Sequence, residues 1–360
     1  MSVPLFDTAT PLAPLEAELQ AKLLEIVASK RFIFGPEVEA FEREFAAYVG
    51  TRHAVGVANG TDALLLGLRA LGVGPGDEVI VPSFTFFASA EPIRLVGATP
   101  VWCDVDPVTF VSTAEMVRAV LTPRTKAVIA VHLFGNVAPI AEIEALGVPV
   151  IEDAAQSAGT RLADGRRPGA LSATLATFSF FPSKNLGAFG DGGAVTTGDA
   201  ALAERIAMLR FHGSHDKRTF ELVGHNSRLD ALQAGVLRVQ LPHLDGWADG
   251  RREAARLYAE AGLGELVSLP EPTPGALPAW HLYVARSGRA DELLGVLREA
   301  GIGCAAYYRV PAHLQPAMRD VPPIVALPGT EEAARTNLAL PMSPVLTREQ
   351  VGEVVAALDD

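Results

Sequence analysis

Residues 178–194 read Phe178-Ser-Phe-Phe-Pro-Ser-Lys-Asn-Leu-Gly-Ala-Phe-Gly-Asp-Gly-Gly-Ala194, and they join two apolar runs through a turn that contains one lysine. The first run, Thr174 to Phe181, is aromatic and β-branched, which predicts a buried strand that Pro182 ends. Four glycines follow Lys184, and glycine lets a backbone approach a ligand closely. Lys184 is therefore either a solvated turn residue or a desolvated amine of lowered pKa, the state that Schiff-base chemistry requires.

A second stretch, Gly147-Val-Pro-Val-Ile-Glu-Asp-Ala-Ala-Gln-Ser157, is an apolar run that ends in two carboxylates. In an open α/β sheet, ligands bind beyond the carboxyl ends of the strands, where Glu152 and Asp153 are expected. Pyridoxal 5'-phosphate needs a lysine that carries it and a carboxylate that keeps its pyridine nitrogen protonated. Lys184 and Asp153 are the predicted catalytic pair, with this cofactor between them.

A candidate anion site lies further upstream. His53 to Val57 predicts a strand, and the following Asn-Gly60-Thr61-Asp62 turn opens an apolar helix with Thr61 or Asp62 as its N-cap. The free N–H groups at such a helix end bind anions. The turn could be structural punctuation alone, but upstream of a Lys/Asp pair of this kind Gly60 and Thr61 are the predicted phosphate cradle.

The strand and helix signals alternate along most of the chain. Continuous Val/Ile runs indicate an α/β fold with a mostly parallel central sheet flanked by helices. A Pro-rich connector, residues 270–278, precedes a strand–helix–strand pattern at 281–285, 291–300 and 302–307, which predicts a smaller α+β domain. The predicted division is an N-terminal arm and helix at 1–35, a large domain at 36–245 and a small C-terminal domain at 246–360.

Composition excludes several classes of function. The net charge of −12 over 360 residues argues against binding nucleic acid through a general basic face. The two cysteines, Cys103 and Cys304, have no metal-ligand spacing and lie in apolar runs, so we expect buried packing thiols and no metal site. No signal peptide and no membrane-length apolar run appear, which predicts a cytoplasmic protein without a membrane partner. The glycines at 190–193 lack dinucleotide-binding spacing.

The Glu-Asp-Ala-Ala-Gln-Ser and Ser-Phe-Phe-Pro-Ser-Lys-Asn-Leu-Gly-Ala motifs together resemble the DegT/DnrJ/EryC1/StrS family of nucleotide-sugar aminotransferases. The resemblance extends from residue 34 to about residue 342 and implies fold type I of the pyridoxal-phosphate transferases. It implies that Phe86 stacks on the cofactor ring, that Gln156 bonds the ring hydroxyl, and that Ser179 contacts the phosphate. Packing roles for Phe86 and Ser179 remain open.

The same resemblance implies a homodimer with shared active sites, because Asn226 would reach the cofactor phosphate of the other subunit. Arg228 would then lie near the nucleotide-sugar, unless it only forms a salt bridge to Asp230. Tyr308 and His313 match a segment that lines the substrate mouth, although packing roles fit them equally well.

The implied reaction moves an amino group from L-glutamate to a nucleotide-linked keto-sugar, with pyridoxamine 5'-phosphate as the intermediate form of the cofactor. The lysine motif favours a 3-keto sugar on UDP or dTDP, and a hexuronate if Arg228 faces a carboxylate. Residues 217–221 lack the tyrosine and histidine that sugar 3-aminotransferases often carry there, which leaves the sugar open. The alternatives are a non-catalytic regulator of the same fold, a sugar dehydratase, which would replace the lysine by histidine, and a cysteine desulfurase.

Overall fold

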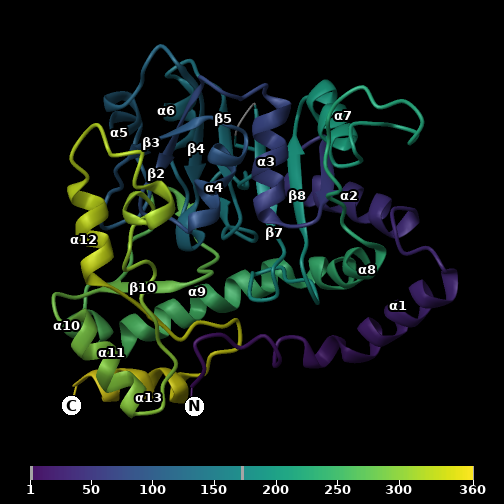
Figure 1. Cartoon of the computed structure of the whole chain (residues 1–360). Helices are drawn as coiled ribbons and strands as arrows, with labels where there is room; N and C mark the ends of the chain where they lie inside the picture. Colours follow the sequence, from purple (N-terminus) through teal and green to yellow (C-terminus); the bar gives the residue numbers. More distant parts are fainter. Residues whose placement is uncertain (1–2, 172–173, 360) are drawn as a thin grey trace.

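Alternate residues of the central strands are buried on opposite faces of one sheet, as Val79 and Val81 are on one face and Ile80 on the other. The computed structural model describes residues 3–171 and 174–359. Within these residues the sheet has seven strands in the order β1-β8-β7-β5-β4-β2-β3 (Figure 1). In chain order the strands are β1 (His53–Val57), β2 (Glu78–Pro82), β3 (Thr99–Cys103), β4 (Thr125–Val131), β5 (Val150–Asp153), β7 (Leu175–Ser179) and β8 (Gly193–Thr197).

The direction of the strands confirms the predicted mostly parallel sheet. β8 is antiparallel to both of its neighbours, β1 and β7. The other neighbouring pairs are parallel, and Asp153 of β5 lies opposite Val131 of β4 and Thr177 of β7. Because parallel strands end at the same edge, the segments after β1, β2, β4, β5 and β7 converge there.

Helices cover both faces of the sheet, which explains why its strands are apolar throughout. One face packs against α3 (Gly60–Ala70), α4 (Glu91–Leu95) and α7 (Ala200–Leu209). The other face packs against α2 (Pro36–Val49), α5 (Ala114–Ala119), α6 (Ile140–Glu144) and α8 (Ala231–Gln240) (Figure 1). α1 (Glu16–Ser29) lies against α8 at the edge of the molecule.

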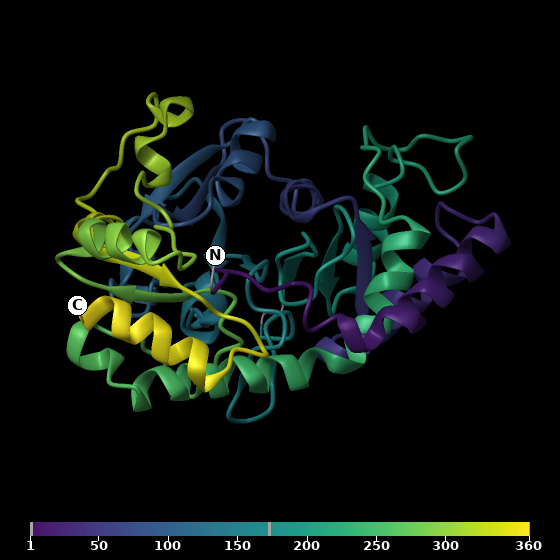
Figure 2. The same cartoon turned by 90° about the horizontal axis from the view of Figure 1, so that it is seen from below.

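The C-terminal part of the chain has a core of its own. In it the antiparallel pair β10 (Tyr283–Arg286) and β11 (Asn337–Leu340) packs with helices α9 (Leu244–Glu260), α10 (Leu263–Leu266), α11 (Ala290–Glu299) and α13 (Arg348–Asp359). Figure 2 shows α13 lying alongside α9. α12 (Pro328–Thr336) leads into β11, and the short strands β6 (Arg161–Leu162) and β9 (Ala276–Leu277) pair separately. Val3 joins this core and pairs with Ile302, so the N-terminal arm is tied to the C-terminal part.

Three predicted elements differ from the structure. The predicted strand at 302–307 is wrong: only single bridges form there, and β11 is the strand that pairs with β10. The sequence also predicts a helix from Ala88 to Val96, but the structure has a short turn at Phe87–Ser89 followed by α4, with Pro92 in the first turn of α4. The sequence further predicts a helix from Arg251 to Ala261, whereas α9 begins at Leu244 and ends at Glu260.

The division into 1–35, 36–245 and 246–360 stays a prediction, and its boundary at 245/246 falls in the first turn of α9. The outermost ends of the predicted ranges, residues 1–2 and 360, lie outside the described residues. None of the helices in the described ranges combines the length and apolar character needed to cross a bilayer.

Candidate active site

A cavity of about 770 Å³ lies where the carboxyl ends of the parallel strands converge. Val131, Asp153 and Ser179, which end β4, β5 and β7, form its floor. Phe6 of the N-terminal arm and residues 281–282 and 307–308 of the C-terminal part close it from the other side. The cavity is therefore built from segments that are distant in sequence and meet at one sheet edge.

Lys184 lines this cavity in the turn after β7, where its backbone N–H donates to the carbonyl of Phe181 at 2.8 Å. Burial lowers the pKa of its ammonium from 10.5 to about 8, and the negative charge of Asp153 opposes part of that effect. None of the ion pairs in residues 3–171 and 174–359 includes Lys184. At pH 7 about a tenth of the amine is then neutral, compared with roughly 0.03% at a pKa of 10.5. The prediction of a desolvated amine agrees with this environment.

Asp153 is the last residue of β5 and is only 5% exposed. The hydroxyl of Ser89 donates to its Oδ2 at 2.7 Å, and the backbone N–H of Ala155 donates to its Oδ1 at 3.2 Å. Thr85 Oγ1 lies 2.8 Å from Ser89 Oγ and extends this chain of hydroxyls. These donors fix the carboxylate at the cavity floor in a single orientation.

The neighbouring carboxylate, Glu152, points away from the cavity. Its Oε2 accepts from the backbone N–H of Gly169 at 2.9 Å and lies 3.0 Å from Nε2 of the buried His132. The other ring nitrogen of His132, Nδ1, accepts from the N–H of Ala138 at 3.0 Å. Of the two carboxylates in the sequence motif, Asp153 alone lines the cavity, and Glu152 holds the surrounding loops together.

The start of α3 forms a cradle at the cavity wall. The N-cap is Asn59, whose side-chain Oδ1 accepts from the N–H of Asp62 at 2.8 Å, so the prediction of Thr61 or Asp62 as the N-cap was wrong by two to three residues. The first N–H groups of a helix have no partner within the helix, and Gly60 and Thr61 present theirs here. A Cβ on Gly60 would lie 2.7 Å from Cβ of Ser179, so only glycine fits between the helix end and that serine.

Phe86, Gln156 and Tyr308 also line the cavity. The ring of Phe86 is 55% exposed and lies 5.9 Å from the ring of Tyr308, whereas Phe84 is fully buried in the core. Gln156 accepts from the N–H of Phe134 at 2.7 Å through Oε1, and its Nε2 donates to the hydroxyl of Tyr308 at 3.3 Å. These contacts fix the amide of Gln156 with its NH₂ group toward the cavity.

Three of the predicted site residues do not line the cavity of their own chain. His313 is placed instead against Ser83, whose Oγ lies 2.6 Å from its Nδ1, and near the ring of Trp102. Asn226 is exposed and pairs only through its backbone with Phe211. Arg228 lies 5.9 Å from the ring of Phe34 and forms no ion pair, with Asp230 or otherwise, in the described part of the chain.

The cysteines lie away from the cavity. Cys103 is buried, and burial raises the pKa of its thiol to about 12. Cys304 is only half-buried, so the expectation of two buried thiols was correct for one of them. Within the described residues no cluster of three or more His, Cys, Asp or Glu side chains could hold a metal ion.

Two cavity residues, Ser89 and His281, were not predicted from the sequence. Ser89 lies in an ordinary Phe-Ala-Ser turn, and its role depends on the 2.7 Å contact with Asp153, 64 residues away. His281 is 4% exposed, its Nδ1 has no hydrogen-bond partner, and it follows Trp280 in a segment that resembles a core strand. Contacts of this kind come from the tertiary fold and leave no local pattern.

The lining residues fit pyridoxal 5'-phosphate. A desolvated lysine and an oriented carboxylate line one cavity. The unpartnered amides of α3 beside a glycine that admits no Cβ offer a place for a phosphate. The exposed face of Phe86 can cover a planar ring.

Comparison with known proteins also points to an aminotransferase. The model of the DegT/DnrJ/EryC1/StrS aminotransferase family matches residues 14–359. A dTDP-3-amino-3,4,6-trideoxy-alpha-D-glucose transaminase of Streptomyces venezuelae is 47% identical, with 99% of this chain and 95% of the relative covered. A UDP-N-acetyl-3-dehydro-alpha-D-glucosamine 3-aminotransferase of Acidithiobacillus ferrooxidans is 43% identical over 99% of this chain and 97% of its own length. The crystal structure of S. venezuelae DesV in complex with a ketimine intermediate superimposes with a TM-score of 0.95 at 46% identity, covering 99% and 97% of the two chains.

Proposed function

The chain belongs to the DegT/DnrJ/EryC1/StrS aminotransferase family and is a sugar transaminase. From this we propose which of its residues carry out the reaction and which substrate it uses. We propose that Lys184 and Asp153 hold pyridoxal 5'-phosphate between them. The observation that carries this proposal is that a lysine of lowered pKa and an oriented carboxylate line the same cavity, beside the helix end at Gly60.

When bound, the cofactor supplies an aldehyde carbon that accepts an amino group and a ring that withdraws electrons from that carbon. Lys184 would hold the cofactor through its aldehyde carbon. The amine of Lys184 would also move a proton between Cα of the donor and the C4′ carbon of the cofactor. An amine with a pKa of about 8 can both accept and give up a proton near neutral pH.

Asp153 would keep a proton on the pyridine nitrogen, because Ser89 and the N–H of Ala155 hold its carboxylate in one orientation. The NH₂ group of Gln156 faces the cavity and would donate to the ring hydroxyl. Gly60, Thr61 and Ser179 would bind the phosphate, and Phe86 would cover the ring face.

For the substrate we propose a dTDP- or UDP-linked 3-keto sugar, aminated at C3 with L-glutamate as donor. Both of the relatives described above are named for 3-amino sugars, one on dTDP and one on UDP. The identity of 47% favours dTDP. Tyr308 lines the cavity next to Phe86, where it could contact the sugar, whereas His313 is held by Ser83 and is not part of this proposal.

We propose further that the active enzyme is a homodimer. Apolar side chains are exposed at Phe181, which lines the cavity, at Phe189, and at Phe32 and Ile33 between α1 and α2. Asn226 is exposed and does not line the cavity of its own chain, which supports a role in completing the phosphate site of a second copy.

The test is a spectroscopic one on the purified protein. Added pyridoxal 5'-phosphate should give an absorbance that glutamate changes and that a dTDP- or UDP-linked 3-keto sugar restores. Lys184→Ala should abolish both changes, because it removes the carrier of the cofactor and the proton-moving group together. An absorbance that does not respond to glutamate would favour the non-catalytic regulator, and deoxygenation of the sugar without amination would favour the dehydratase.

A further inference from the structure

A second, smaller cavity of about 320 Å³ lies on the other side of Lys184. It shares Phe6, Ser183 and Lys184 with the main cavity, so the two meet at the lysine. Its far wall contains Arg251 of α9. The roles proposed for the cofactor and the sugar involve the main cavity and not this smaller one.

Arg251 is a buried cation without an anionic partner. It is only 8% exposed, and no ion pair in residues 3–171 and 174–359 includes it. Its NH1 reaches the carbonyls of Trp280 and Met342 at 3.2 and 3.4 Å, while Nε has no hydrogen-bond partner among the described residues. Burial lowers the pKa of its guanidinium to about 10, so the group still carries its charge at neutral pH. A buried charge of this kind is costly unless something pairs with it.

Two further polar atoms beside Lys184 are buried and unpartnered, Nδ1 of His281 and Oδ1 of Asn185. Asn185 lines the small cavity, and its orientation is fixed because Nδ2 donates to the carbonyls of Ala158 and Ala279 at 3.2 and 3.0 Å. Its Oδ1 can therefore only accept. The pKa of His281 is held well below its usual value, mainly by burial and further by the positive charges of Lys184 and Arg251. Because those two charges act on His281, the three basic groups lie close together.

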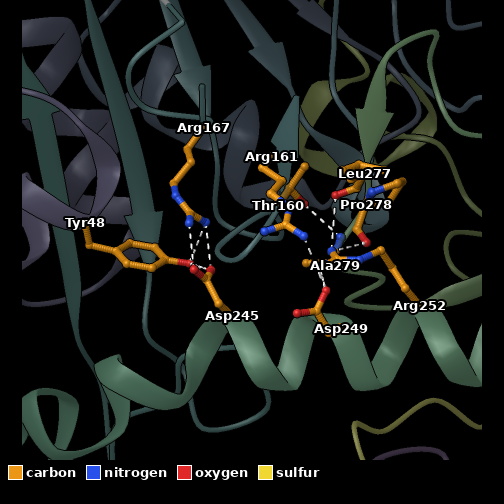
Figure 3. Close-up of polar contacts among 10 residues, drawn as sticks. All are labelled: Tyr48, Thr160, Arg161, Arg167, Asp245, Asp249, Arg252, Leu277, Pro278 and Ala279. Carbon is orange, nitrogen blue, oxygen red and sulfur yellow. Dashed lines mark hydrogen bonds and ion pairs between the residues drawn. The ribbon is translucent and has the colours of Figure 1, made fainter. Parts of the chain in front are cut away.

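The position of Arg251 is set by the anchoring of α9 (Figure 3). Asp245, one and a half turns before it, accepts from Arg167 at 2.7 and 2.8 Å and from the hydroxyl of Tyr48 at 2.7 Å. The next residue, Arg252, donates to Asp249 and to the carbonyls of Leu277 and Pro278. The helix is thus fixed on the side shown in Figure 3. Arg251 lines the small cavity and has no side-chain partner among the described residues.

We infer that Arg251 binds a carboxylate of the amino-acid donor, and that the small cavity is the donor subsite of the reaction. An amino acid brings both a carboxylate for the unpartnered Nε–H of Arg251 and an ammonium for the unpartnered Oδ1 of Asn185. A diphosphate offers no donor to Asn185, and a cavity of about 320 Å³ is at the small end of the range of ligand sites, roughly 300–1,000 Å³. This inference rests on the proposed function.

Binding of the donor and binding of the sugar can be measured separately, because glutamate reacts in the first half-reaction and the keto-sugar in the second. Arg251→Met should raise the apparent dissociation constant for glutamate in the first half-reaction about 30-fold or more, the loss expected when one partner of a buried charge pair is truncated. Arg251→Lys should recover part of that affinity, because it keeps the charge. The second half-reaction, in which enzyme carrying the amine form of the cofactor meets the keto-sugar, should change less than about threefold.

Arg252→Met is the matched control, since Arg252 is adjacent, has the same chemistry and also bonds backbone carbonyls, but does not line the cavity. Calorimetric titration of the cofactor-loaded protein with 2-oxoglutarate gives a readout apart from turnover: binding should weaken in Arg251→Met and not in Arg252→Met. Equal losses in both half-reactions with a lower melting temperature would overturn the inference and leave Arg251 a structural residue. Weakened binding of the nucleotide-sugar alone would overturn it in favour of a diphosphate site. A wild-type protein that does not respond to glutamate would refute the proposed function itself, and with it the donor subsite.

Discussion

Replacing Lys184 by methionine should make the cofactor-free protein more stable at neutral pH. Burial lowers the pKa of the ammonium from 10.5 to about 8, which corresponds to about 3 kcal/mol against the charged form in the folded state. Below pH 8 the lysine is charged in both the folded and the unfolded protein, so the wild type carries this whole penalty. Methionine has similar length and no charge, and Lys184 has no ion pair among the described residues to lose.

The pH dependence gives the sharper test. Between pH 8 and about 10.5 the folded protein releases its proton from Lys184 while the unfolded protein keeps it, so wild-type stability should rise with pH in this window. The advantage of Lys184→Met should therefore be largest at pH 7 and should decrease as the pH approaches 10. Guanidinium unfolding of the two cofactor-free proteins at pH 7, 8.5 and 10 measures it.

Lys126→Met is the control, because Lys126 is an exposed lysine in β4 and its replacement should change the free energy of unfolding by less than about 0.5 kcal/mol. A variant at position 184 that is less stable than the wild type at pH 7, or an advantage that does not change with pH, would refute the account of a desolvated ammonium.

Three other predictions follow from the same contacts. Ser89→Ala removes the hydroxyl that donates to Asp153 at 2.7 Å. It should lower kcat about tenfold, since a hydrogen bond to a charged group contributes about 1.5–3 kcal/mol. Stopped-flow kinetics measures this loss, and an unchanged affinity for the cofactor would show that the variant still binds it. Gly60→Ala places a Cβ 2.7 Å from Cβ of Ser179 and should weaken binding of pyridoxal 5'-phosphate about tenfold in a fluorescence titration, whereas Gly74→Ala, whose Cβ meets nothing within 4 Å, should not. Asp245→Asn weakens the contacts with Arg167 and Tyr48 in Figure 3 and should lower the free energy of unfolding by about 1 kcal/mol at pH 7. Although burial alone would raise the pKa of Asp245, the hydrogen bonds from Arg167 and Tyr48 hold that pKa below its usual value. The difference in unfolding free energy between wild type and variant should therefore persist at pH 5 and disappear only below about pH 4.

The sequence predicted best what depends on local pattern. β1 has the predicted bounds, His53 to Val57, and the buried Val/Ile runs became the parallel strands. Lys184 and Asp153 could be paired from the sequence because each belongs to a motif with its own chemical meaning. Strand order then brings Asp153 and Ser179 to one edge, which follows from the rule that parallel strands end together.

What the sequence could not predict depends on contacts between distant segments. The run at 302–307 has strand composition, but within the described residues its β-pairing is limited to single bridges, from Ile302 to Val3 and from Ala305 to Ala339 of β11. Arg251 lies in a helix rich in charged residues and resembles its neighbour Arg252, yet one is buried against the carbonyls of Trp280 and Met342 and the other is not. His313 matched a substrate-contacting segment, but Ser83, 230 residues away, holds its ring.

The separation between Lys184 and Asp153 is what makes the pair useful. A buried lysine and a buried carboxylate in one cavity would normally form an ion pair, which would hold the amine protonated. Here Ser89 and the N–H of Ala155 bond the carboxylate at the cavity floor, and no contact within 4.0 Å joins it to the lysine in the described structure. Asp153 still raises the pKa of Lys184, but less than burial lowers it, so the pKa of the amine stays at about 8. The space left between the two groups is where, as proposed above, pyridoxal 5'-phosphate would be held. If Ser89 were lost, Asp153 would be free to turn toward Lys184, and the pKa of the lysine should rise as the activity falls.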